Sequence, residues 1–119
     1  MEELKGLLEK YKDFLVLVEG EKDERALKQL GFSNSMRLKK PLYAVVEDVL
    51  AEGVQEVVIL TDLDQEGKKL YAYLFKHLNH FGVKVNNELR DYLFEKTQLR
   101  QTEGIVTYIE HQNAHSQTI

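Results

Sequence analysis

Two short runs made entirely of apolar residues constrain the fold of this chain more than any other feature. Residues 14–18 read Phe-Leu-Val-Leu-Val, and residues 57–60 read Val-Val-Ile-Leu. Their length suits a strand, and apolar residues at every position indicate that both faces of the strand are buried. Strands of this kind occur in parallel sheets that helices cover on either side. The two runs therefore predict the centre of a parallel α/β sheet.

Helical patterns alternate with these runs, as a parallel sheet requires. The expected helices cover residues 2–11, 22–30, 67–81 and the segment from Pro41 to Gly53. Shorter segments at 34–38 and 83–85 are the other expected strands, and helical segments at about 87–96 and 102–111 follow them. Residues 112–119 are polar and are expected to be a frayed tail. Alternating strands and helices predict a mainly parallel sheet of about four strands.

Composition limits the classes to which the protein can belong. The chain has 119 residues, of which 43% are hydrophobic and 30% charged, as expected for a single globular domain spanning residues 1–119. A net charge of −4 excludes a purely electrostatic, histone-like binder of nucleic acid. The absence of cysteine excludes a disulfide framework, a zinc ribbon and a thiol nucleophile. The longest apolar run, Phe14–Val18, is far shorter than the roughly 20 residues that span a bilayer, so we expect a cytoplasmic protein with no membrane partner.

Acidic side chains follow both apolar runs. Glu19 comes directly after the first run, and Asp62 and Asp64 lie just past the second, with Glu66 at the start of the next expected helix. Ligands of parallel sheets bind beyond the carboxyl ends of the strands, so we expect these acids to converge at one edge. Oxygen ligands without cysteine favour a hard ion. The sequence therefore predicts a site for Mg²⁺, or alternatively Mn²⁺.

The same acids have simpler interpretations. Acidic residues at the start of a helix cap its N–H groups, so a solvated capping loop stays open as an alternative. An EF-hand is disfavoured, because the residue at its last ligand position would be Tyr73 rather than glutamate. No P-loop motif is present. Gly20 and Gly67 are expected to leave room for a phosphate or a substrate backbone.

Together the two acidic segments resemble the Toprim domain of topoisomerases, bacterial-type primases, some nucleases and recombination proteins. That domain has a Glu at the end of one strand and D-x-D, usually followed by Gly, at the end of another. Residues 18–23 read Val-Glu-Gly-Glu-Lys-Asp, and residues 59–67 read Ile-Leu-Thr-Asp-Leu-Asp-Gln-Glu-Gly. The resemblance covers about residues 14–86. It implies a Rossmann-like three-layer α/β sandwich in a small stand-alone Toprim protein, similar to the ribosomal-RNA maturation nucleases.

The resemblance also implies roles for individual side chains. Glu19 would match the family's general acid/base, and Asp62 and Asp64 would match its Mg²⁺ ligands. Asp23 matches a further acid of the first motif, where it is expected to support the start of a helix. Glu66 matches the third acid of the topoisomerase version. In such chemistry the ion neutralises charge on a phosphodiester, while a carboxylate moves a proton at the attacking or leaving oxygen.

Hydrolysis is the simplest reaction for such a domain alone, because topoisomerases carry their nucleophilic Tyr in a separate domain. The expected function is a Mg²⁺-dependent nuclease acting on RNA or DNA. The alternative is a non-catalytic module that binds nucleic acid or a partner protein within a larger complex. Lys22 and Lys68 are the leading candidates for phosphate contacts, because each follows an acid-bearing strand end. Other basic candidates are Arg37, Lys39, Lys40, Lys69, Arg90 and Arg100.

Overall fold

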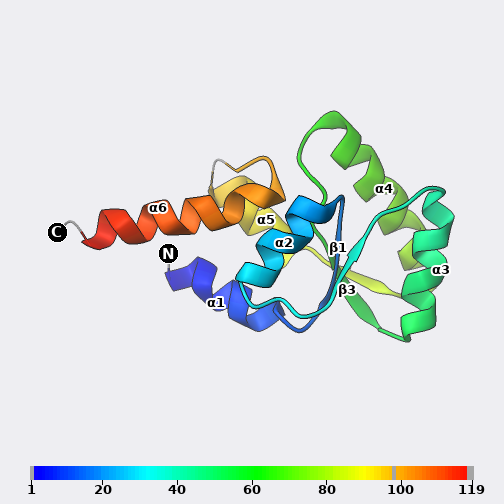
Figure 1. Cartoon of the computed structure of the whole chain (residues 1–119). Helices are drawn as coiled ribbons and strands as arrows, with labels where there is room; N and C mark the ends of the chain where they lie inside the picture. Colours follow the sequence, from blue (N-terminus) through cyan, green and yellow to red (C-terminus); the bar gives the residue numbers. More distant parts are fainter. Residues whose placement is uncertain (1, 98, 118–119) are drawn as a thin grey trace.

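A parallel sheet forms the centre of the molecule (Figure 1). The computed structural model describes residues 2–97 and 99–117, and its sheet has four strands in the order β2-β1-β3-β4. The strands are β1 (Leu15–Val18), β2 (Ser35–Arg37), β3 (Glu56–Ile59) and β4 (Lys84–Asn86). This order places β1 and β3, which precede the two acidic motifs, side by side in the middle. The predicted parallel α/β architecture is confirmed.

Helices cover both faces of the sheet, which gives the predicted three-layer sandwich (Figure 1). One face is covered by α3 (Leu42–Glu52) and α4 (Gln65–His80), and the other by α1 (Glu2–Tyr11), α2 (Glu21–Gln29), α5 (Glu88–Asp91) and the start of α6 (Ile105–Gln117). Alternate residues of each central strand point to opposite faces. The first core contains Leu15, Leu17, Val57 and Ile59, and the second contains Val16, Val18, Val58 and Leu60.

The C-terminal region is more regular than its composition predicts. A π-helix (Tyr92–Lys96) continues from α5, and a 3-10 helix (Thr102–Gly104) leads into α6. The polar segment expected to be frayed is helical as far as Gln117, while Thr118 and Ile119 lie outside the described residues. Ile105 is fully buried and anchors the first turn of α6. Once a first turn is fixed, each further residue adds a hydrogen bond at little cost, so polar residues extend the helix.

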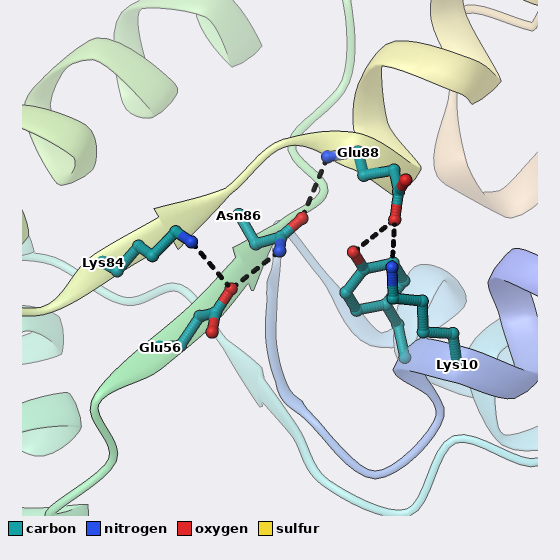
Figure 2. A network of polar contacts seen from close by, with 6 residues as sticks. Lys10, Glu56, Lys84, Asn86 and Glu88 are labelled. Carbon is teal, nitrogen blue, oxygen red and sulfur yellow. Dashed lines mark hydrogen bonds and ion pairs between the residues drawn. The ribbon is translucent and has the colours of Figure 1, made fainter.

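A polar network fixes α5 against the sheet and against α1 (Figure 2). Glu56 on β3 accepts a hydrogen bond from Asn86 Nδ2 at 2.7 Å, and Asn86 Oδ1 accepts one from Glu88 N at 3.0 Å. Glu88 Oε1 in turn accepts from Lys10 Nζ at 2.9 Å and from Tyr11 Oη at 2.5 Å. The start of α5 is thereby held from two directions. This anchoring positions the rest of α5 beside the carboxyl end of β3.

The connection between β2 and α3 ends in a proline. Pro41, which follows a cis Lys40–Pro41 bond, is the N-cap residue of α3, so the helix begins at Leu42, one residue later than the expected segment. Among the residues that the structure describes, no helix is long and apolar enough to cross a membrane.

Candidate functional site

The first two acids of the predicted site meet at the carboxyl edge of the sheet. The parallel register pairs Leu17 with Ile59, so the residues that follow β1 and β3 lie level with each other. Glu19 Oε2 accepts a hydrogen bond from the backbone N–H of Asp62 at 2.6 Å, across 43 positions of sequence. Glu19, which follows β1, therefore supports the loop after β3 that carries Asp62 and Asp64.

The loop between β3 and α4 is held closed by its own hydrogen bonds. Asp64 is the N-cap residue of α4, and its Oδ1 accepts from Gly67 N at 2.7 Å. The hydroxyl of Thr61 donates to the carbonyl oxygen of Gly67 at 2.8 Å. A Cβ at Gly67 would lie 2.0 Å from the carbonyl oxygen of Asp62. The expectation that Gly67 makes room for a substrate is therefore wrong, because the backbone of Asp62 fills that space.

Helix capping, the simpler interpretation of the acids, holds for part of the site. Asp64 caps α4, and Asp23 Oδ2 accepts from Gly20 N at 3.1 Å, which supports the start of α2 as predicted. Gly20 itself is extended, with a φ of −154°, and a Cβ there would meet open space. Each capping bond uses one carboxylate oxygen, and a carboxylate has a second oxygen that can still face a ligand. Capping and ligand binding are thus compatible here.

A segment near the C-terminus completes the acidic edge, although the sequence pattern did not connect it with the site. We call this segment, residues 99–104, the C-terminal strap. Leu63 N donates to Arg100 O at 2.8 Å. Thr102 N donates to Asp62 Oδ1 at 3.0 Å, and the Thr102 hydroxyl donates to Leu60 O at 2.8 Å. The strap therefore orients the Asp62 carboxylate, and no local pattern signals a contact between residues 40 positions apart.

Arg90 lies behind the acidic edge and is only 7% exposed, so it does not serve as the surface phosphate contact that the sequence suggested. Its Nη1 donates to Thr61 O at 2.5 Å and lies 3.4 Å from Ile59 O. The centre of the guanidinium lies 4.6 Å from the ring centroid of Tyr71 and 5.1 Å from that of Phe94. This buried cation therefore binds the carboxyl end of β3 from within.

Burial raises the pKa of three acids near this edge, Glu19, Asp62 and Asp23. For Glu19, burial raises the pKa, and the charges of Asp62, Asp64 and Asp23 raise it further, against the hydrogen bond from Asp62 N. Burial also raises the pKa of Asp62 and of Asp23, and the negative charge of Glu103 in the strap raises the pKa of each further. Carboxylates that repel one another are stabilised when a cation binds between them or when they share a proton. Such groups are candidates for a functional site.

The donors at this edge are carboxylate oxygens, which suit a hard divalent cation. Among the described residues, no three Asp, Glu or His side chains are grouped closely enough to hold a metal ion as they stand. Mg²⁺ does not need such a closed set, since proteins bind it through one or two carboxylates together with water and substrate phosphates. Asp62 and Asp64 each have one oxygen fixed by a backbone N–H. The pair therefore fits an open Mg²⁺ site.

Glu66, Lys22 and Lys68, the remaining predicted site residues, are exposed and lie in different surroundings. Glu66 is exposed and lines a cavity of about 170 Å³ together with Glu19 and Lys40. Lys22 is exposed and lines a different cavity, of about 390 Å³, together with Glu103 of the C-terminal strap. Lys68 is also exposed, directly after the buried residue Gly67 on α4. The structure thus places Glu66 beside Glu19, and Lys22 beside the C-terminal strap.

A larger cavity lies away from these acids. It measures about 520 Å³ and lies between α1 and the segment formed by α5 and the π-helix. Its charged residues include Lys10 and Glu88, whose Nζ and Oε1 atoms already pair at 2.9 Å. Size alone does not indicate chemistry, so the acidic edge of the sheet remains the better candidate site.

Comparisons with known proteins identify relatives of this chain. The sequence matches the family model of the Toprim domain over residues 14–94. It is 31% identical over 98 residues to the UPF0292 protein MJ1624 of Methanocaldococcus jannaschii, covering 79% of this chain and 77% of that protein. A UPF0292 protein of Methanosarcina acetivorans is 32% identical over 117 residues, covering 92% of this chain and 79% of that protein. A solved structure of a protein from Aquifex aeolicus is similar with a TM-score of 0.75 at 28% identity, covering 87% of this chain and 95% of that one.

Proposed function

The chain belongs to the Toprim family, and from this premise we propose that it is a small Mg²⁺-dependent nuclease that hydrolyses phosphodiester bonds in RNA or DNA. Family membership supports a metal-binding module with a role connected to nucleic acid. One observation carries the step to catalysis. Glu19 Oε2 lies 2.6 Å from the backbone nitrogen of Asp62, so a group suited to proton transfer is adjacent to the candidate metal ligands.

In this proposal Asp62 and Asp64 hold the ion, which is Mg²⁺ or Mn²⁺, and Glu66 adds a further carboxylate. A bound divalent ion neutralises charge on a phosphodiester and orients it. Thr102 N fixes Asp62, and Gly67 N fixes Asp64. Side chains that are already oriented lose little freedom on binding, so such bonds favour a site that is ready for its ligand.

Glu19 supplies the proton transfer. A general acid or base works best when its pKa lies near the working pH, and burial raises the pKa of Glu19 in that direction. During hydrolysis a water oxygen forms a bond to phosphorus, the bond from phosphorus to the leaving oxygen breaks, and that oxygen gains a proton. In this proposal Glu19 either takes the proton of the water or supplies the proton of the leaving group.

The alternative from another class is a non-catalytic module that binds nucleic acid or a partner protein. The net charge of −4 favours it, because a chain with this charge binds a polyanion weakly without help at physiological salt. A partner chain would then supply the grip on the substrate. Cleavage by the isolated protein distinguishes the two functions.

The test is cleavage of end-labelled structured RNA, single-stranded DNA and double-stranded DNA with Mg²⁺ or Mn²⁺, compared with EDTA. The variants are Glu19→Gln and Asp64→Asn, because each new amide can still accept the hydrogen bond that holds it. Glu47→Gln, an exposed change on α3, is the matched control. We expect cleavage that needs the metal, survives in the control and is lost in both variants. Equal cleavage by wild type and Asp64→Asn would exclude the proposed function.

A further inference from the structure

Two cavities flank the start of α4, and each combines an acid of the site with a cation. The first, of about 170 Å³, is lined by Glu19 and Glu66 together with Lys40 from the turn between β2 and α3. The second, of about 390 Å³, is lined by Asp64 together with Arg100 of the C-terminal strap. Asp64, the N-cap residue of α4, and Glu66 in its first turn are two residues apart yet line different cavities. The acidic edge therefore lies between two cavities that each carry a positive charge.

The two cavities lie on different layers of the sandwich. Leu42 and Leu70, which line the first cavity, belong to α3 and α4 on one face of the sheet. Leu99, which lines the second, packs against the core on the other face. A ligand that reaches from one cavity to the other must cross the carboxyl edge of the sheet, where the acids lie.

We propose that a single nucleic-acid strand crosses this edge, so that one of its phosphodiesters faces the acids. Lys40 binds a backbone phosphate on one side of that phosphodiester, and Arg100 binds a backbone phosphate on the other side. The inference rests on the proposed function and adds the path of the substrate to it. A repeating phosphate backbone matches the arrangement, because it presents one anion to each cation and one to the site between them. A single free phosphate would engage only one of the three positions.

Both cations are available for such contacts. Lys40 and Arg100 are exposed, and neither forms a salt bridge within the described residues. The neighbouring Lys39 differs, because its Nζ lies 2.7 Å from Asp48 Oδ2. Arg100 Nη1 donates to Leu99 O at 2.8 Å, but a guanidinium has five N–H donors. The remaining donors can bind a phosphate in the bidentate manner that arginine favours.

Electrostatics explains why the cations are needed on both sides. Carboxylates repel a phosphate backbone, and the chain as a whole has a net charge of −4. At physiological salt, charges act over about 8 Å, so the cations that offset this repulsion must lie close to the path of the strand. Lys40 and Arg100 line the same cavities as the acids and therefore meet this requirement.

The path has a natural continuation beyond Arg100. The cavity of Arg100 shares Gln101 and Gly104 with a third cavity, also of about 390 Å³. Lys22, which the sequence singled out as a phosphate contact, lines that third cavity. The two cavities are therefore neighbours on either side of the C-terminal strap, and Lys22 is expected to contact the strand farther from the acids than Arg100 does.

The test is fluorescence anisotropy with short labelled single strands of RNA and of DNA of the same sequence, in EDTA so that no cleavage occurs. The variants are Lys40→Gln, Arg100→Gln and the double change, and the matched control is Lys76→Gln, an exposed lysine farther along α4. The slope of log K against log salt is negative, and each lost phosphate contact on a single strand makes it shallower by about 0.7. We expect that change in each single variant, about twice as much in the double variant and none in the control, with at least one of the two strands.

Two results would overturn the strand path. One is that Lys40→Gln and Arg100→Gln bind with the same salt slope as Lys76→Gln, and the other is that wild type binds neither strand at low salt. The proposed function fails separately, when Asp64→Asn cleaves as well as wild type. If the wild-type chain cleaves but the two cation variants bind normally, only the strand path is wrong.

Discussion

Gly67 lies so close to Asp62 that its α-hydrogen occupies a space no side chain could fill. A Cβ at Gly67 would lie 2.0 Å from the carbonyl oxygen of Asp62, 2.7 Å from its carbonyl carbon and 2.9 Å from its nitrogen. All three are backbone atoms and cannot move without moving the loop that carries Asp62 and Asp64. The glycine of this motif therefore sets the position of the acids.

Gly67→Ala is expected to destabilise the protein. Alanine is better than glycine within a helix by about 1 kcal/mol, but forced shifts in a packed region cost about 1–3 kcal/mol and must here displace backbone. Urea unfolding measures the difference. Gly6→Ala is the control, since Gly6 is exposed on α1 with open space around its Cβ position, and it should gain about 0.5–1 kcal/mol. A gain of stability in Gly67→Ala similar to that in Gly6→Ala would contradict the close contact.

Arg90→Lys is expected to destabilise the protein although it preserves the charge. The guanidinium donates to Thr61 O and lies against the rings of Tyr71 and Phe94. A lysine lacks the planar group that does both. A buried carbonyl left without its donor costs about 1–3 kcal/mol, which denaturant unfolding detects. Arg25→Lys at an exposed position should stay within about 0.5 kcal/mol of wild type. Full stability of Arg90→Lys would mean that only the charge matters.

Asp62→Asn is expected to raise stability at neutral pH in the absence of metal. Burial raises the pKa of Asp62, and Asp64 and Glu103 add to the shift. A carboxyl with a raised folded pKa adds stability below its ordinary pKa of 3.8 and loses it as the pH rises through the folded value. The amide removes the charge and can still accept from Thr102 N.

Thermal unfolding in EDTA at neutral and acidic pH tests this change. The advantage of Asp62→Asn over wild type should shrink as the pH falls toward 3.8. Glu47→Gln, which removes an exposed acid of equal charge, serves as the control. A lower melting temperature for Asp62→Asn than for Glu47→Gln at neutral pH would show that the acidic edge is not under electrostatic strain.

Glu88→Gln is expected to change stability with the opposite dependence on pH. The hydrogen bond from Tyr11 lowers the pKa of Glu88, and Lys10 lowers it further. A carboxylate with a lowered folded pKa adds stability above its ordinary pKa of 4.5 and loses it as the pH falls through the folded value. Wild type should therefore be more stable than Glu88→Gln at neutral pH, and the two should converge in acid. Chemical unfolding across this range measures the difference, and a gap that persists in acid would point to packing instead.

The sheet was predictable because its central strands are buried on both faces, which leaves a continuous apolar pattern at residues 14–18 and 57–60. The meeting of Glu19 with Asp62 followed, since the carboxyl ends of parallel strands share one edge. Thr102 could not be predicted in the same way. Its bond to Asp62 depends on the chain returning to the site after 40 residues, and no local pattern reports such a return.

Arg90 and Gly67 show a second limit. An arginine in a polar helical segment has the pattern of an exposed cation, and only the tertiary structure reveals the aromatic rings and strand carbonyls that surround it. The motif likewise contains Gly67 without showing whether a ligand or the protein itself fills the space beside it. The approach of Glu19 to the loop after β3 was therefore predictable, whereas the contacts of Arg90, Gly67 and Thr102 were not.

Calorimetric titration of the protein with Mg²⁺ tests most directly whether Asp62 and Asp64, which follow β3, form a cation site beside Glu19. We expect a single cation site, with one saturable binding event in wild type and in Glu47→Gln. Loss of a supporting group already lowers metal affinity by about 10–100-fold, so Asp62→Asn and Asp64→Asn, which remove ligand charge but keep their hydrogen bonds, should each weaken binding at least tenfold. Equal Mg²⁺ affinity in wild type and in both variants, or no saturable binding in wild type, would contradict it.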